Sequence, residues 1–226
     1  QGGSRDGTGP GSGPRTTELT TEGERTVETR TLERVLKITK IGRESGAVRR
    51  VHRVPFHGEY NNAIHVYNVL VLLWAFRPQL WATLGPAALF HDAPERFTGD
   101  IPGQVIDNHP ELASALRAMD EDICARFGIP DAHQLSPEHR DVLKALDRLE
   151  LWLWCLEQYR MGNEQAEEIK LRIEAGWLKK PLPHDMQEFV ECVRWVWARM
   201  PEDADEADKW IKDHFNPEED DDFDAH

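Results

Sequence analysis

Side chains that bind protons or metal ions are concentrated in the stretch "ALFHDAPERFTGD", residues 88–100. An apolar run ends at the adjacent pair His91 and Asp92, and Glu95 and Asp100 follow within nine residues. Burying an unpartnered carboxylate costs on the order of several kcal/mol. A divalent cation would offset this cost, because imidazole nitrogen and carboxylate oxygen are standard ligands of Mn, Co, Zn and Fe. The stretch therefore predicts part of a metal site.

Two further polar side chains stand in apolar helical surroundings elsewhere in the chain. His65 lies within "NNAIHVYNVLVLL", and Asp147 lies within a segment rich in Leu and Trp. Taken alone, His65 is typical of a buried imidazole bonded to a backbone carbonyl. Asp147 alone is typical of a carboxylate paired with Arg148 or Lys144. Polar positions on three apolar helices instead favour one shared site of two imidazoles and two carboxylates.

The elements that must position these residues are predicted to be helices. Helical periodicity recurs along the chain and strand signals are scarce, so an all-α domain of six or seven helices is expected. The expected helices cover residues 26–41, 61–76, 80–97, 111–129, 136–163, 163–177 and 184–200. Ser136 followed by proline is a strong start signal, and Gly162 is a stop signal. Residues 98–110 are expected to form a loop.

The two ends of the chain differ from its middle in composition. Residues 1–26 are rich in Gly, Ser, Thr and Pro, lack the apolar core of a signal peptide, and are predicted to be disordered. From residue 201 onward, twelve acidic residues and two lysines contribute −10 of the formal charge of −14. Residues 201–226 are therefore predicted to be an acidic, largely disordered tail. The folded domain is expected to span residues 27–200.

Composition also argues against several classes of function. The middle of the chain carries no basic stripe, which argues against nucleic-acid binding. Its longest apolar run, "VLVLLWAF", is too short to span a membrane. The three cysteines are widely spaced, which favours a reduced, cytoplasmic protein. This composition is compatible with a small anionic substrate, because binding such a substrate needs only a metal ion or local positive charge.

In order and context these residues resemble the HD-domain metal-dependent phosphohydrolases, which carry the pattern H…HD…D on successive buried helices. The resemblance runs from Arg50 to Gly162 and is strongest for bacterial 5′-deoxynucleotidases and related phage deoxynucleoside triphosphate hydrolases. "ALFHDAPERFTGDIP" is similar to their His-Asp-x-x-Glu…Thr-Gly-Asp-[Leu/Ile]-Pro signature. "ALDRLELWLWCLEQYRMGN" is similar to their Ala-Asp…Cys-Leu-Glu helix. The fold that this implies is an HD-domain helical bundle around a single metal site.

The resemblance also implies a role for each polar residue. The implied ligands of one divalent ion (Mn, Co, Zn, Fe or Mg) are His65, His91, Asp92 and Asp147. Glu95 would orient or deprotonate the attacking water, and Asp92 would help to fix this nucleophile. Asp100 would take part in catalysis or contact the sugar. The alternatives are a surface carboxylate beside an arginine for Glu95 and a turn residue for Asp100.

Substrate binding is expected from the basic loop "RRVHRV". Arg50 lies fifteen residues before His65, which is the spacing of the phosphate-contacting arginine in the relatives. An arginine there is suited to phosphate because its planar fork of N–H groups matches phosphate oxygens. His52 and Arg53 are further candidates. The alternative is a basic loop on a solvated surface.

The chain departs from the family pattern at three places. Ile64 precedes the first histidine, where relatives have Glu, and Val51 stands where they have Trp. No lysine follows the Thr-Gly-Asp-Ile-Pro turn, although relatives often place one there. Because a tryptophan can hold a base and a lysine can hold distal phosphates, the identity of the substrate is left open.

The expected function is hydrolysis of a (deoxy)nucleotide by a metal-dependent phosphohydrolase, either a 5′-deoxynucleotidase or a deoxynucleoside triphosphate hydrolase. One alternative is hydrolysis of another phosphate ester or a signalling nucleotide. A second alternative is a non-catalytic helical regulatory module that retains a relic HD site. The expected partner is a small-molecule nucleotide. A homodimer is compatible with the resemblance and with the aromatic surface that "WLWCLEQY" is expected to offer.

Overall fold

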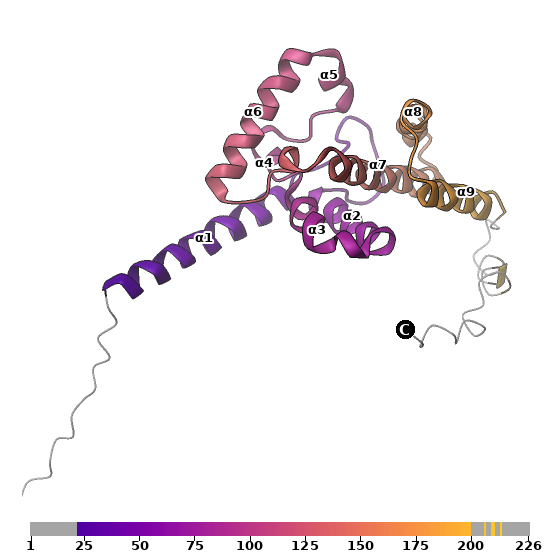
Figure 1. Cartoon of the computed structure of the whole chain (residues 1–226). Helices are drawn as coiled ribbons and strands as arrows, with labels where there is room; N and C mark the ends of the chain where they lie inside the picture. Colours follow the sequence, from indigo (N-terminus) through magenta and orange to yellow (C-terminus); the bar gives the residue numbers. More distant parts are fainter. Residues whose placement is uncertain (1–21, 200–205, 207–208, 211–212, 214–226) are drawn as a thin grey trace, which may run out of the picture.

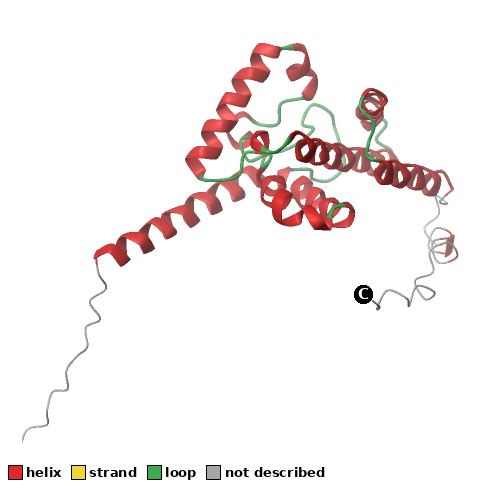
Figure 2. Cartoon of the chain, in the orientation of Figure 1, coloured by secondary structure: helices red, strands yellow, loops and turns green. Residues whose placement is uncertain are grey.

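The computed structural model describes residues 22–199, 206, 209–210 and 213. Within these residues the chain forms helices and loops, and the one β-type contact is an isolated bridge between Arg49 and Asn61 (Figures 1 and 2). The helices are α1 (Glu22–Gly46), α2 (Asn62–Phe76), η1 (Pro78–Leu80), α3 (Trp81–Phe90), α4 (Glu95–Thr98), α5 (Gly103–Asn108), α6 (Pro110–Phe127), η2 (Ala132–Gln134), α7 (Pro137–Arg160), α8 (Gln165–Lys179) and α9 (His184–Arg199). This confirms the predicted all-α fold class.

The expected six or seven helices correspond to the longer elements of the described chain. The two shortest α-helices, α4 and α5, were not predicted as separate elements. Helices of four and six residues are too short for a periodic apolar pattern to reveal them. No helix in the described ranges combines the length and the hydropathy needed to cross a bilayer.

The predicted ends of the domain fall largely outside the described residues. Residues 1–21 and most of 201–226 are not described, so the predicted disorder of both ends remains a prediction. Helix α1 begins at Glu22, inside the segment that was predicted to be disordered. Its apolar positions Leu32, Val35 and Leu36 are exposed, and in Figure 1 the first half of α1 extends away from the other helices.

The main core lies between α2, α3, α7 and α9. Its fully buried members include Leu73 of α2, Leu84 of α3, Leu146 and Trp152 of α7, and Met186 of α9. Helix α7 packs against both α2 and α8, so it runs through the middle of the molecule. Asp147 on α7 is only partly buried, with 33% of its side-chain surface exposed.

Helix α2 has nearly its predicted bounds, whereas α3 ends seven residues before the predicted boundary. Asn61 is the N-cap of α2, because its side chain accepts a hydrogen bond from the backbone N–H of Ile64 at 3.1 Å. Helix α3 continues through Pro86 and stops at Phe90. The predicted helix over residues 80–97 is therefore interrupted, and His91 lies in the turn that follows α3.

Helix α7 begins as predicted, with Ser136 as its N-cap and proline at its first position. The segment "WLWCLEQY" does not offer the aromatic surface that was expected of it. Trp152 is fully buried, Trp154 is 6% exposed, and only Tyr159 is about half exposed. The two tryptophans belong to the interior because α2, α8 and the loop before α2 cover this part of α7.

Candidate metal centre

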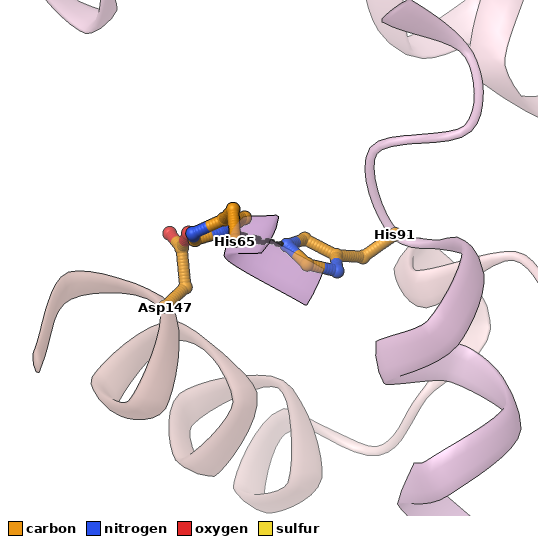
Figure 3. A group of neighbouring side chains, drawn as sticks. All are labelled: His65, His91 and Asp147. Carbon is orange, nitrogen blue, oxygen red and sulfur yellow. Dashed lines mark hydrogen bonds and ion pairs between the residues drawn. The ribbon is translucent and has the colours of Figure 1, made fainter. Parts of the chain in front are cut away.

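Three separate elements bring the predicted metal ligands together. Helix α2 contributes His65, the turn after α3 contributes His91 and Asp92, and α7 contributes Asp147. One ligand atom each from His65, His91 and Asp147 lies within 4.8 Å of the other two (Figure 3). Oδ2 of Asp92 lies 3.2 Å from Nε2 of His91 and 3.5 Å from Nε2 of His65. The four side chains therefore converge on one point.

The spacing of these atoms fits a single cation. Nε2 of His65 lies 3.0 Å from Oδ1 of Asp147 and 3.3 Å from Nε2 of His91. A divalent ion bound about 2.1 Å from each ligand atom places neighbouring ligand atoms roughly 3.0–3.4 Å apart, in octahedral or tetrahedral geometry. The longest pair in this cluster, Nε2 of His91 to Oδ1 of Asp147, is 3.9 Å. The residues present can therefore hold one small divalent ion.

The hydrogen bonds of the two imidazoles support the same conclusion. Nδ1 of His91 lies 2.7 Å from the carbonyl oxygen of Ala88, and Nδ1 of His65 contacts Oε2 of Glu150. Both partners can only accept, so in the neutral imidazoles that can bind a cation both hydrogens belong on Nδ1 and both Nε2 atoms present lone pairs to the cluster. Lone pairs that face one another and two carboxylates repel, and a bound cation removes that repulsion.

Arg50 supplies positive charge to the same cluster from the loop before α2. It is 8% exposed, its Nη1 donates to Asp92 and to Oδ1 of Asn62 at 3.2 Å, and its Nη2 lies 4.0 Å from Oδ1 of Asp147. Burial alone would raise the pKa of Asp92, but in the metal-free cluster a protonated His91 and Arg50 hold that pKa below its usual range. The Nε of Arg50 is buried and has no hydrogen-bond partner among the described residues.

Glu95 lies beside this cluster, one tight turn after Asp92. The backbone N–H of Glu95 donates to the carbonyl of Asp92 at 3.1 Å, so the two side chains leave the same turn. Burial, together with the negative charge of Asp92, raises the pKa of Glu95 to about 8. Nδ2 of Asn62 donates to Oε2 of Glu95 at 2.8 Å and fixes the carboxyl group.

Sequence reasoning did not identify Asn62 as a site residue. Asn62 is the first residue of α2 and follows the N-cap Asn61. Asn62 is 2% exposed and bridges Arg50 and Glu95. Its position three residues before His65, on the same face of the helix, was an available signal.

Asp100 contacts the loop that carries Arg50. Its Oδ2 accepts a hydrogen bond of 2.9 Å from the backbone N–H of Val51. Val51 has a φ of +50°, a left-handed conformation that β-branched residues rarely adopt. Asp100 therefore stabilises an unfavourable backbone conformation directly next to Arg50. The expected role in catalysis or sugar contact remains a prediction.

The structure does not bring His52 and Arg53 into the cluster. Both side chains are exposed on the loop after Arg50, and Nη1 of Arg53 donates to Gln104 of α5 at 3.4 Å. Their expected role in substrate binding therefore gains no support from their position.

A cavity of about 450 Å³ opens beside the cluster. Its lining includes four residues of the site (His91, Asp92, Glu95 and Asp147), three apolar residues (Ile101, Ile106 and Leu116) and three basic residues (His133, Arg140 and Lys144). Two further acidic residues of the lining have basic partners, because Asp120 lies 3.4 Å from His133 and Asp141 pairs with Lys180. This volume lies in the range of pockets that bind small molecules.

A buried carboxylate behind His65 was also missed from the sequence. Glu150 lies on α7, three residues after Asp147, and is 2% exposed. It accepts hydrogen bonds from the Tyr60 hydroxyl at 2.5 Å and from Nδ2 of Asn68 at 3.2 Å, as well as contacting His65. The spacing of three from Asp147 places Glu150 on the same face of the helix, which is the signal that could have found it.

An all-α bundle that gathers two imidazoles and two carboxylates around one ion-sized point has the arrangement expected of an HD-type metal site. The chain is 30% identical to the 5′-deoxynucleotidase YfbR of Escherichia coli O1:K1 over 119 residues, which is 46% of this chain and 58% of the relative. It is also 30% identical to the 5′-deoxynucleotidase YfbR of Shigella boydii serotype 18 over 117 residues, with the same two shares.

These relatives confirm the predicted resemblance to the 5′-deoxynucleotidases of the HD superfamily. The match spans 58% of the length of these curated relatives, less than two thirds. No protein-family profile matches the chain.

Proposed function

We propose that this chain is a metal-dependent phosphohydrolase that acts on (deoxy)nucleotides, as a 5′-deoxynucleotidase or a deoxynucleoside triphosphate hydrolase. The observation that carries the proposal is the convergence of His65, His91, Asp92 and Asp147, with ligand-atom spacings that suit one divalent ion. The similarity to proteins named 5′-deoxynucleotidase supports a nucleotide as substrate.

His65, His91, Asp92 and Asp147 would hold the divalent ion. When bound there, a divalent cation lowers the pKa of water and withdraws electron density from a phosphoryl oxygen.

Arg50 binds the phosphoryl group in this proposal. Its guanidinium is already buried among the carboxylates, and its unpartnered Nε has a hydrogen to donate. An unpaired N–H in the interior is costly, so a phosphoryl oxygen that accepts from it is bound more tightly. Arg50 thereby neutralises part of the charge that develops on the phosphoryl oxygens.

Glu95 accepts a proton from the attacking water. The water oxygen forms a bond to phosphorus, the bond between phosphorus and the ester oxygen breaks, and the nucleoside leaves. The proton held by Glu95 is then available to the leaving oxygen. A pKa raised to about 8 makes this carboxylate a stronger base than an exposed glutamate, and Asn62 fixes its direction.

The nucleoside occupies the adjoining cavity. Ile101, Ile106 and Leu116 offer apolar surface to a base and sugar, and the cluster side chains line the end where the phosphate binds. Arg140 and Lys144 are available to further phosphate groups.

The test is phosphate release from a panel of nucleoside mono-, di- and triphosphates, in both deoxy and ribo forms, with Mn²⁺, Co²⁺, Zn²⁺ or Mg²⁺ added in turn. We expect hydrolysis of deoxynucleotides that is lost with chelator and lost in Asp147→Ala. Release of phosphate from a triphosphate, compared with release of tripolyphosphate, identifies the bond that is cut.

Three results would contradict the proposal. Hydrolysis that survives both chelation and Asp147→Ala would exclude the metal cluster as its source. A folded protein that takes up metal and hydrolyses no nucleotide in the panel would favour another phosphate ester. A folded protein that takes up no metal would favour the non-catalytic module.

A further inference from the structure

Glu150 is a buried carboxylate that faces away from the cavity, behind the first metal ligand. It accepts from the hydroxyl of Tyr60, the amide of Asn68 and Nδ1 of His65. Burying a carboxylate is costly unless its oxygens are hydrogen-bonded. Three donors for one buried carboxylate meet that cost, so Glu150 is held in one orientation.

The contact with Glu150 determines which nitrogen of His65 faces the cluster. Because a carboxylate can only accept, it keeps the imidazole hydrogen on Nδ1. Nε2 then carries the lone pair. It lies 3.0 Å from Oδ1 of Asp147, 3.3 Å from Nε2 of His91 and 3.5 Å from Oδ2 of Asp92. In the opposite tautomer Nε2 would carry the hydrogen and could not bind a cation.

Tyr60 connects this contact to the other half of the site. Its backbone carbonyl accepts from the N–H of Arg50 at 3.0 Å, and the Arg50 guanidinium lies 6.0 Å from the centre of its ring. The ring is 1% exposed and stacks on Trp154, with centroids 4.5 Å apart and planes 16° apart. The rigid side chain of Tyr60 therefore contacts both Glu150, which supports His65, and the guanidinium of Arg50.

We infer that Glu150 and Tyr60 are positioning residues, which orient His65 for a divalent cation and hold Arg50 against the same centre. This inference rests on the proposed function for the role of Arg50, but its metal-binding part does not depend on hydrolysis. Partners that orient a metal-binding histidine typically contribute about 10- to 100-fold to metal affinity.

The first test measures the dissociation constant of Co²⁺, by competition with a chelator, for the full chain and its variants. Glu150→Leu removes the acceptor, and we expect about 10- to 100-fold weaker binding. Glu150→Gln keeps one oxygen that accepts, so we expect a clearly smaller loss. The matched control is Glu157→Leu, two turns further along α7 and exposed, which should bind Co²⁺ like the wild type.

The second test uses ¹⁵N chemical shifts of the histidine rings in the metal-free wild-type protein, which needs no substitution. At a pH at which the ring is neutral, we expect His65 to be protonated on Nδ1 and not on Nε2. Tyr60→Phe keeps the stacking on Trp154 but removes the hydroxyl, and we expect weaker Co²⁺ binding and a higher KM for the nucleotide.

Two outcomes would overturn the inference. One is a folded Glu150→Leu variant, checked by circular dichroism, that binds Co²⁺ as tightly as the wild type. The other is a neutral wild-type His65 ring that is protonated on Nε2 and not on Nδ1, and this result decides the matter if Glu150→Leu does not fold. A protein that binds Co²⁺ as expected but hydrolyses no nucleotide would refute the proposed function and leave the role of Glu150 intact.

Discussion

Glu95 shows how the surroundings of one residue set its chemistry. Burial and the negative charge of Asp92 raise its pKa to about 8, with a smaller contribution from Asp100, while Arg50 and the hydrogen bond from Asn62 oppose the rise. A carboxyl group must lose its proton before it can act as a base. The rate should therefore increase with pH as the pH passes the pKa of Glu95.

We predict an ascending limb in the pH profile of kcat/KM that depends on Glu95. A cation in the neighbouring cluster favours the ionised carboxylate, so the limb should lie below pH 8 in the metal-loaded protein. Glu95→Gln should lower kcat by roughly 100-fold or more and remove the limb, while Co²⁺ binding is retained. A Glu95→Gln variant with an unchanged profile would assign the limb to another group.

Asp100 is predicted to act through its hydrogen bond to Val51. Asp100→Ala leaves the N–H of a residue with positive φ unpaired, which should cost about 1–3 kcal/mol, loosen the loop and raise KM. Asp100→Asn keeps an oxygen that accepts, so it should behave nearly like the wild type. Thermal unfolding and steady-state kinetics of both variants provide the measurement. Equal and severe loss of kcat in both would instead assign the carboxylate to the chemistry or to the sugar.

At the scale of elements, one face of α7 carries both the proposed metal ligand Asp147 and two basic residues that line the cavity. It carries Arg140 and Lys144 into the cavity at positions seven and three residues before Asp147. An α-helix rises 1.5 Å per residue, so these cations stand at increasing distance from the metal centre. This arrangement suits a substrate with negative charge beyond the phosphate that is hydrolysed.

We therefore predict that Lys144→Met raises KM for a deoxynucleoside triphosphate by about tenfold, because a charged hydrogen bond is lost. KM for the corresponding monophosphate should change by less than about twofold. Steady-state kinetics with both substrates measure the difference. Lys179→Met on α8, away from the cavity, is the control. Equal changes in KM for the two substrates would contradict a role in binding distal phosphates.

Helix α2 is apolar on both of its faces. His65, Val69 and Leu73 face the interior, while Tyr67 and Trp74 are among its exposed side chains. A helix that is hydrophobic all round is usually covered on every side. The homodimer remains a prediction. The aromatic surface expected of "WLWCLEQY" is largely buried, so the exposed apolar side chains of α2 are the surface that is compatible with such a dimer.

At the scale of the whole molecule, metal binding should be visible as stability. The four proposed ligand side chains come from α2, the turn after α3 and α7, so an unfolded chain would not bind the ion in the same way. A ligand at 100 times its Kd adds about 2.7 kcal/mol to folding, which corresponds to a rise in Tm of roughly 5–10 °C for a protein of this size.

We predict that Tm rises with added Mn²⁺ or Co²⁺, as measured by scanning calorimetry, and that Asp147→Ala abolishes the rise. The control is Asp141→Ala, which removes an exposed carboxylate of the same helix that pairs with Lys180. An equal rise in Asp147→Ala would show that the stabilising ion binds elsewhere.

Much of the fold and the centre of the site follow from local features of the sequence. Helices are set by apolar periodicity and by caps such as Asn61 and Ser136, and these signals act over a few residues. The four residues that are proposed as ligands could be predicted because a polar side chain on an apolar helix needs a partner, whatever the packing. His65 and Asp147 were conspicuous for this reason.

Only the tertiary structure decided which side chains meet across helices. The bridging by Asn62, the support of His65 by Glu150 and the bond from Val51 to Asp100 join residues that are 33, 85 and 49 positions apart. Periodicity shows which face of a helix is apolar, but it does not say which element covers that face. For the same reason, the burial of Trp152 and the exposure of His52 depended on how the helices pack and where the loop runs.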